Sequence, residues 1–367
     1  MKDSTSLTKI ALQKFKTNFW GVLSFAFLVV CVLVAIFAYA VAPDNSRHAN
    51  QMHLSIHSKS PGFTVKILTI PTPVEEQNPL AVFFFGKKNA DTEIPISSFS
   101  TKGNSIEITE YTPDGTEGLQ KEYALSLFPN ASSVSDVPNK YISEKKFILG
   151  TDKYGRDLLS RMLIGIRISL AIGFVAVLIS LVIGISMGAI AGYFGGKVDA
   201  AIMWLINVTW SIPTLLLVIA ITLALGKGFW QVFIAVGLTM WVEVARVVRG
   251  QVMGVKQMQY VTAAKALGFN DFRIIVKHIL PNSMAPVIII SAANFAGAIL
   301  IESGLSFLGI GAQPPMPSWG GIIKDHYAYI ILGKPYLALI PGFAIMSLVT
   351  AFMLIGNALR DAMDVRQ

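Results

Sequence analysis

Gln259-Tyr-Val-Thr-Ala-Ala-Lys-Ala-Leu-Gly268 is a polar-faced stretch between two long apolar runs. Its alanines predict a helix over Tyr260 to Leu267, because alanine is the strongest helix former. Gly268 suits the left-handed residue that ends a helix. The small Ala263 and Ala264 would let the backbone of a partner come close. The stretch therefore predicts a short helix with a defined end and an approachable surface.

The stretch continues to Lys277-His-Ile-Leu-Pro281. Asn270 and Asp271 predict the cap of a second helix from Phe272 to Ile279. Pro281 is expected to end this helix, because proline cannot donate the next backbone hydrogen bond. Two short helices joined by a glycine turn would form a protrusion. A plain amphipathic helix at a membrane surface is the alternative that these residues leave open.

The composition indicates an integral membrane protein. The 367 residues are 53% hydrophobic and only 14% charged, whereas a soluble domain averages roughly a quarter charged. The net charge of +8 lies beside apolar runs, so we expect no nucleic-acid partner. The clustered cations are Lys2, Lys9, Lys14, Lys16, Arg246, Arg249, Lys256, Lys265, Arg273 and Lys277. The positive-inside rule therefore places the N-terminus and the Gln259–Pro281 stretch in the cytoplasm.

Six apolar runs predict six membrane spans, with both chain ends in the cytoplasm. A spanning helix needs about 20 apolar residues. The runs are 19–42, Ile168–Gly192, Ala200–Leu225, Trp230–Val248, Met284–Ile301 and Tyr336–Leu359. The third run is interrupted by Ser211-Ile-Pro213, so we expect a break there.

Residues 43–147 differ in composition from the rest of the chain. Alternating apolar and polar residues predict strands over Phe63–Ile70 and Ser105–Tyr111. Thr112-Pro-Asp-Gly115 supplies the residues of a turn. We therefore expect a small β-rich insertion on the extracytoplasmic side.

No pattern predicts a metal site, a disulfide or an active site. Cys31 is the only cysteine, and it lies inside an apolar run. Three nearby histidines lack the carboxylate or cysteine that would complete a metal site: His48, His53 and His57. Gly192–Lys197 is superficially similar to a phosphate loop. However, Val198 stands where Ser or Thr would hold magnesium.

Polar groups within the spans predict either helix contacts or a lined pathway. Asn207 and Ser211 lie near Pro213, which frees backbone carbonyls. Asn294 lies in the fifth run, and Glu302 lies at its outer end. An ionisable group at that position needs a partner or water. Hydroxyl groups can equally join helices, and that alternative stays open.

A charged motif precedes the second span: Leu149-Gly-Thr-Asp-Lys-Tyr-Gly-Arg-Asp-Leu-Leu-Ser-Arg161. Its carboxylates and guanidinium groups can pair locally, and they suit an interfacial helix over 148–167. This motif resembles the G-T-D-x-x-G-R-D signature of ABC-transporter permeases of the dipeptide, oligopeptide and nickel branch. The matching residues are Gly150, Asp152, Gly155, Arg156 and Asp157.

Three further stretches resemble the same family, in the same order. Residues 255–281 resemble the EAA loop, which the family inserts into its ATPase subunit; Thr262 stands where many members have Glu. The loop residues we assign are Tyr260, Thr262, Ala263, Ala264, Gly268, Leu280 and Pro281. Ile301–Gly311 and Pro317–Gly321 resemble the external gate loop, with Glu302 and Trp319 matching. The resemblance implies a gate role for Glu302 and Trp319. With the polar residues of the spans, the candidate translocation path or gate is Asn207, Ser211, Pro213, Asn294, Glu302 and Trp319.

The resemblance implies an all-α integral membrane protein with the six transmembrane helices of the type I ABC importer permease fold. It corresponds to the second-permease, C-type subunit. The expected segments are a cytoplasmic segment (1–18), a first transmembrane helix (19–42), a β-rich extracytoplasmic insertion (43–147), an interfacial helix (148–167), the core transmembrane domain (168–359) and a cytoplasmic tail (360–367). Family members usually have a much shorter connection in place of the insertion.

The implied function is that of a permease subunit without its own ATPase site. It would import peptides or a similar small solute across the bacterial cytoplasmic (inner) membrane as a multi-pass protein. The implied partners are a second homologous permease, two ABC ATPase subunits that bind ATP and magnesium, an extracytoplasmic substrate-binding protein and the lipid membrane. No cofactor is expected on this chain. A passive channel or a membrane receptor is the alternative, and partner-dependent ATPase activity separates the two.

Overall fold

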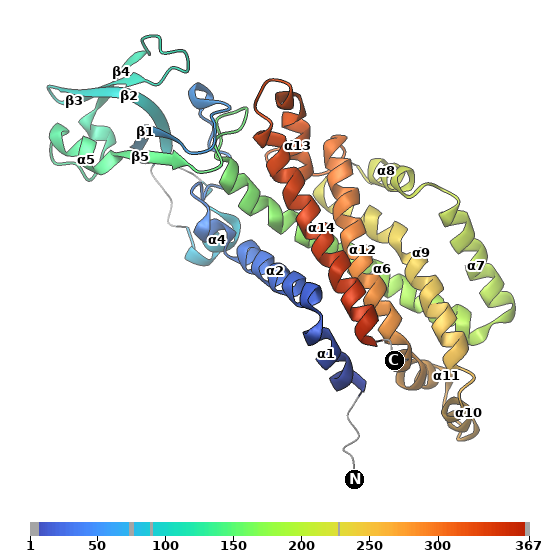
Figure 1. Ribbon diagram of the computed structural model, residues 1–367. Helices are drawn as coiled ribbons and strands as arrows, with labels where there is room; N and C mark the ends of the chain where they lie inside the picture. Colours follow the sequence, from blue (N-terminus) through green and yellow to red (C-terminus); the bar gives the residue numbers. More distant parts are fainter. Residues whose placement is uncertain (1–6, 73–76, 89–90, 227, 364–367) are drawn as a thin grey trace. The chain divides into compact units, whose positions relative to one another are not determined.

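The computed structural model describes residues 7–72, 77–88, 91–226 and 228–363 (Figure 1). The predicted cytoplasmic ends therefore lie partly outside the described residues, including Lys2 and residues 364–367. The chain divides into two compact units, which are described separately. The helical unit contains Met1–Val32, Ser169–Gln313 and Phe343–Gln367; the sheet unit contains Leu33–Ile168 and Pro314–Gly342.

Among the described residues, five helices are long and apolar enough to cross a membrane. They are α2 (Phe19–Ile36), α6 (Leu158–Phe194), α9 (Phe229–Val255), the continuous helix Asp271–Phe307, and α14 (Tyr336–Met363). A sixth candidate is the pair α7 (Gly196–Trp210) and α8 (Thr214–Ala224), which is bent by 91°. The bend follows from Pro213, whose ψ of 125° is not helical and whose nitrogen cannot donate a hydrogen bond.

The shorter helices lie at the ends and in the connections. They are α1 (Leu7–Thr17), α3 (Ala38–Val41), α4 (Pro79–Phe85), α5 (Val137–Tyr141), α10 (Gln259–Ala266), α11 (Asp271–Ile274) and α13 (Trp319–His326). A π turn over Ile275–Ile279 joins α11 to α12 (Leu280–Phe307).

The sheet unit holds a five-stranded antiparallel sheet in the order β4-β3-β2-β1-β5. Its strands are β1 (Phe63–Ile70), β2 (Thr92–Lys102), β3 (Ser105–Glu110), β4 (Gln120–Ala124) and β5 (Ile142–Phe147). Alternating residues place Leu68, Ile96 and Ile108 in a core with Phe128. The strands predicted from alternation are therefore confirmed. The extracytoplasmic position of this sheet stays a prediction.

The first predicted span is shorter than its apolar run. The run covers 19–42, but α2 ends at Ile36 and α3 is a separate turn. Hydropathy cannot reveal this break, because the residues on both sides of it are apolar.

The helix predicted over 148–167 is wrong in its extent. The helix begins only at Leu158 and then runs unbroken to Phe194. Residues 148–157 form a loop instead, because Gly150 and Gly155 have φ of 79° and 73°. A Cβ atom at Gly155 would lie 1.8 Å from the carbonyl oxygen of His53, so a side chain there is excluded.

Candidate functional site

The loop after α9 is a helical hairpin, in which α10 and α11 are joined by a turn at Gly268. Gly268 has φ of 76°, as the sequence predicts. Its N–H donates to the carbonyl of Lys265 at 3.0 Å, and the N–H of Phe269 donates to the carbonyl of Ala264 at 3.2 Å. These two bonds form a Schellman motif, which satisfies carbonyls at the end of α10. The direction of the chain after α10 is therefore fixed by backbone conformation.

The second helix of this hairpin does not end where the sequence predicts. Asn270 caps it as expected, since its Oδ1 accepts the N–H of Arg273 at 2.8 Å. Pro281 was expected to end the helix, but it lies in the first turn of α12 instead. The preceding π turn already changes the hydrogen-bond pattern, so the missing N–H of proline interrupts no α-helical bond. Leu280, the first residue of α12, continues the same helix.

The hairpin exposes large apolar side chains at its tip. Leu267 is 73% exposed and Phe272 is 75% exposed, and Tyr260 is also exposed. The exposed cations beside them are Lys265, Arg273 and Lys277. Exposed apolar residues that gather in this way mark a surface for a partner. Sequence reasoning missed Leu267 and Phe272 as surface residues, because they were assigned only to helices.

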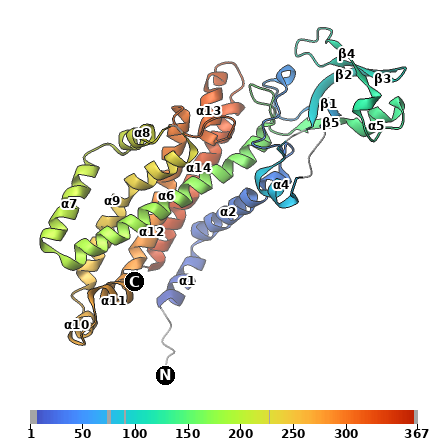
Figure 2. The ribbon, with the colours of Figure 1, turned by 180° about the vertical axis from the view of Figure 1, so that it is seen from behind.

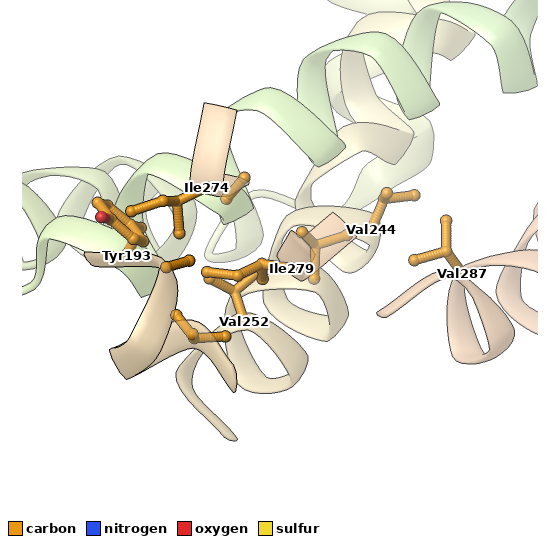
Figure 3. Packing of buried hydrophobic residues seen from close by; sticks show 10 residues of the cluster. Tyr193, Val244, Val252, Ile274, Ile279 and Val287 are labelled. Atoms are coloured by element: carbon orange, nitrogen blue, oxygen red, sulfur yellow. The ribbon is translucent and has the colours of Figure 1, made fainter. Parts of the chain in front are cut away.

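The inward face of the hairpin packs on a buried cluster (Figure 3). The cluster joins four elements of the helical unit: Ala189 and Tyr193 of α6, Val244, Val248 and Val252 of α9, Val261, Ala264, Ile274 and Ile279 of the hairpin, and Val287 of α12. The expectation that a partner approaches Ala264 is wrong, because this side chain is buried within the chain itself. Ala263 and Thr262 remain exposed on the other face.

The helices beneath the hairpin pack closely. α6 lies beside α9 (Figure 2), and a Cβ atom at Gly192 would lie 2.8 Å from the carbonyl oxygen of Arg249. Small residues at such crossings allow backbones to approach in membranes. The hairpin therefore rests on a tightly packed base.

Polar bonds around the cluster tie the hairpin to its neighbours. The hydroxyl of Tyr193 donates to Oδ1 of Asp271 at 2.5 Å. Lys256 donates to the carbonyl oxygen of Tyr193 at 2.5 Å. The guanidinium group of Arg249 binds the carboxylate of Asp199 through two bonds, of 2.5 and 2.6 Å. No local sequence pattern predicts these pairs, because their members lie 50 to 78 residues apart.

The predicted path residues of α7 lie at its C-terminal end. Asn207 Oδ1 accepts a hydrogen bond of 2.9 Å from Arg246, whose guanidinium group lies 3.6 Å from the centre of the Trp210 ring. Ser211 donates to the carbonyl oxygen of Asn207 at 2.8 Å. With Pro213 two residues later, these side chains stand at the bend between α7 and α8.

Asn294 and Glu302 are both buried in α12. Glu302 Oε1 accepts a 2.6 Å hydrogen bond from the hydroxyl of Ser306, which itself accepts the N–H of Ala312 at 3.1 Å. Glu302 is thus linked to the loop that follows α12. The amide nitrogen of Asn294 is buried and has no hydrogen-bond partner among the described residues.

Trp319 belongs to the sheet unit, whereas Glu302 belongs to the helical unit. The indole N–H of Trp319 donates to the carbonyl oxygen of Met162 at 3.1 Å. Its ring also lies against Gly165. The two matched gate residues are therefore described in separate units.

The motif of residues 150–157 is a loop organised by Asp152. This buried carboxylate accepts the backbone N–H of Tyr154 at 2.8 Å and that of Arg156 at 2.9 Å. It also binds the guanidinium groups of Arg156 and Arg161, at 2.6 and 3.7 Å. Local pairing of these charges was predicted. Asp157 instead accepts the N–H of Ser160 at 2.8 Å, at the start of α6.

Asp157 of this loop and His326 beside it lie outside the candidate spans and have shifted pKa values. Burial raises the pKa of Asp157, and the hydrogen bonds from Ser160 only partly oppose it. Burial also lowers the pKa of His326. His326 Nε2 accepts the N–H of Lys153 at 3.1 Å, while Nδ1 donates to the carbonyl oxygen of Ile322 at 2.7 Å. This bonding requires the neutral imidazole ring.

Comparisons with known proteins match residues 181–366 to the family described as "Binding-protein-dependent transport system inner membrane component". Residues 6–61 match the "N-terminal TM domain of oligopeptide transport permease C". The chain is 40% identical over 216 residues to the glutathione transport system permease protein GsiD of Pectobacterium atrosepticum, which covers 59% of this chain and 71% of that protein.

Two further relatives have other names. The dipeptide transport system permease protein DppC of Bacillus subtilis is 42% identical over 215 residues, covering 59% of this chain and 67% of that protein. The oligopeptide transport system permease protein OppC of Haemophilus influenzae is 42% identical over 215 residues, covering 59% of this chain and 69% of that protein.

Proposed function

The chain belongs to the binding-protein-dependent transport system inner membrane components, as a C-type permease subunit of an ABC importer, and we propose that its solutes are short peptides. The chain is a permease and not the ATPase subunit. It has the type I ABC permease fold, with five or six apolar helices. The names of its relatives support the proposed solute, because dipeptides, oligopeptides and glutathione are all short peptides.

The proposed complex contains a second permease, two ATPase subunits that bind ATP and magnesium, and an extracytoplasmic substrate-binding protein. The proposed location is the bacterial cytoplasmic membrane. The coupling loop, Gln259–Pro281, would enter a groove of the ATPase subunit. The observation that carries this proposal is an exposed apolar tip, Leu267 and Phe272, on a base of buried side chains. Such a tip can bind a partner without deforming.

In this mechanism, ATP binding closes the pair of ATPase subunits and moves the coupling loop. The loop continues into α12, so its displacement reaches the buried Asn294 and Glu302 along one helix. The spans would alternate between outward-open and inward-open states, as a shift between two packed arrangements. This chain would transmit the work and form part of the path.

The test is reconstitution with the partner subunits in proteoliposomes. We expect a short peptide and the binding protein to stimulate ATP turnover and to produce peptide uptake. Leu267→Ser with Phe272→Ser should abolish copurification of the ATPase subunit. The matched control is Leu332→Ser, since Leu332 is 67% exposed but lies in the sheet unit. If a nickel chelate stimulates ATP turnover and peptides do not, the proposed solute is wrong, but the proposed permease role still stands.

The proposed topology places residues 43–147 outside the cytoplasm and both chain ends inside. Reporter fusions at Gly115, in the connection between β3 and β4, and at Gly268 should report opposite sides of the membrane. Reports from the same side would contradict this topology.

A further inference from the structure

The short helix α4 (Pro79–Phe85) exposes an apolar surface that the transport mechanism does not use. None of its seven residues is buried, and Leu80 and Phe85 are 68% and 65% exposed. Asn78 caps the helix by accepting the N–H of Leu80 at 2.9 Å. Apolar side chains gathered on one exposed helix indicate contact with an apolar medium or partner.

The contacts of α4 place it at a membrane boundary. The ring of Phe83 lies 5.6 Å from the ring of Phe37, the residue that follows α2. The 18 residues of α2 rise by about 27 Å, which is close to the roughly 30 Å of a hydrocarbon core. The end of α2 therefore lies at the boundary, and α4 lies beside it (Figure 1).

A second set of contacts also places α4 at a membrane boundary. Arg167 of α6 donates from Nη1 to the carbonyl oxygen of Phe84 at 2.7 Å, and its guanidinium group lies 5.1 Å from the centre of the Tyr39 ring. From Arg167 to its end at Phe194, α6 rises by about 40 Å. This exceeds the hydrocarbon thickness, so Arg167 also lies near a boundary. An arginine beside a tyrosine is typical of that level.

Two exposed lysines directly follow the apolar helix. Gly86 turns the chain at φ of 75°, and Lys87 and Lys88 come next. The backbone of Lys87 is fixed, because its N–H donates to Asn45 at 3.0 Å and its carbonyl accepts from Arg47 at 2.9 Å. The two lysines therefore lie in a turn at the C-terminal end of the apolar helix. Cations next to an apolar helical face are typical of segments that lie in a lipid surface.

We propose that α4 is a membrane anchor of the 43–147 insertion. Leu80, Phe84 and Phe85 enter the acyl region of the leaflet at which α2 ends, and Lys87 and Lys88 bind phosphates of anionic phospholipids. The proposal requires only that α2 spans the membrane. It depends neither on the solute nor on the side to which the insertion is exposed, so it can fail while the proposed function stands.

The test uses a fluorescent probe sensitive to polarity in the full-length chain. Phe85→Cys is labelled in a Cys31→Ala background and reconstituted in vesicles, without a binding protein. Leu119→Cys is the matched control, because Leu119 is 69% exposed and precedes β4 in the same insertion. Quenching lipids carry a nitroxide at a shallow acyl position, and the anionic fraction is varied.

We expect the Phe85 probe to emit at shorter wavelength than the Leu119 probe and to lose fluorescence with nitroxide lipids. Lys87→Gln with Lys88→Gln should remove the dependence of this loss on anionic lipid. Equal emission and no quenching at the two positions would overturn the proposal. A shift at Phe85 only after the binding protein is added would also overturn it, and would assign α4 to a protein contact.

Discussion

The hydroxyl of Tyr193 donates a 2.5 Å hydrogen bond to Oδ1 of Asp271, which ties the last turn of α6 to the first turn of α11. The Tyr193 ring is part of the buried cluster, whereas Asp271 is exposed. One residue therefore supports the coupling loop both by packing and by a bond at the edge of the cluster.

Tyr193→Phe should weaken coupling without unfolding the protein, because it keeps the ring and removes only this bond. A hydrogen bond to a charged group contributes about 1.5–3 kcal/mol. We expect ATPase binding to fall by about 10- to 100-fold, because this bond holds the loop in place and each 1.4 kcal/mol is a factor of ten. In a double-mutant cycle with Asp271→Asn, the second substitution should add little. Additive losses would show that the two side chains act independently.

Gly268→Val should leave insertion and abundance intact but abolish transport-coupled hydrolysis. No atom lies within 4 Å of a Cβ atom built at Gly268, so the cost comes only from the left-handed backbone, about 1–2 kcal/mol. Gly268→Ala should be milder. Gly254→Val is the matched control, because its surroundings are equally open and its φ is not positive. Coupled turnover at the normal rate in Gly268→Val would remove the loop from the mechanism.

Glu302→Gln should lower peptide uptake at normal protein levels. The side-chain oxygen of Gln can still accept the hydrogen bond from Ser306. The fall in uptake therefore reports the loss of the negative charge. Ser306→Ala removes the donor of that bond, and it should lower uptake in the same direction. Initial rates of labelled peptide uptake measure both effects. Unchanged uptake in Glu302→Gln would make the carboxylate structural.

The loop of residues 150–157 should loosen as the pH falls. Burial lowers the pKa of His326, while its bond to Ile322 and the carboxylates of Asp152 and Asp325 oppose this only in part. Lys153 lowers it further, and the Tyr329 ring is the other neighbour. The pKa of His326 in the folded protein lies below the ordinary value of about 6.5. The stabilisation of the loop by neutral His326 is therefore complete above about pH 6.5 and is lost at lower pH, as the ring takes up a proton.

Hydrogen exchange at the Lys153 amide, corrected for intrinsic rates, measures this loosening. In His326→Gln, an amide oxygen can still accept the N–H but does not titrate, so protection should no longer depend on pH between about 5 and 8. His53 contacts the same loop through Gly155, at 3.3 Å. His53→Gln should therefore keep the pH dependence if His326 causes it.

The sequence predicted the features that depend on neighbouring residues. Gly268 ends a helix because of its own backbone freedom, and Phe63–Ile70 forms a strand because its alternation suits a sheet with one buried face. Local patterns could not reveal the bond between Tyr193 and Asp271, which lie 78 residues apart. Nor could local patterns show that Ala264 faces inward while Ala263 faces outward, since both residues are alanine. The roles of the path residues stay predictions.

The π turn over Ile275–Ile279 adds one residue to an otherwise α-helical path from Asp271 to Phe307. An α-helix turns by about 100° per residue, so this turn sets the rotational phase of all of α12. Removal of one residue here would restore α-helical bonding and rotate Asn294 and Glu302 together, by about that angle, off their present faces. The five residues of the π turn therefore determine the direction in which both side chains point, although the turn ends more than ten residues before either of them.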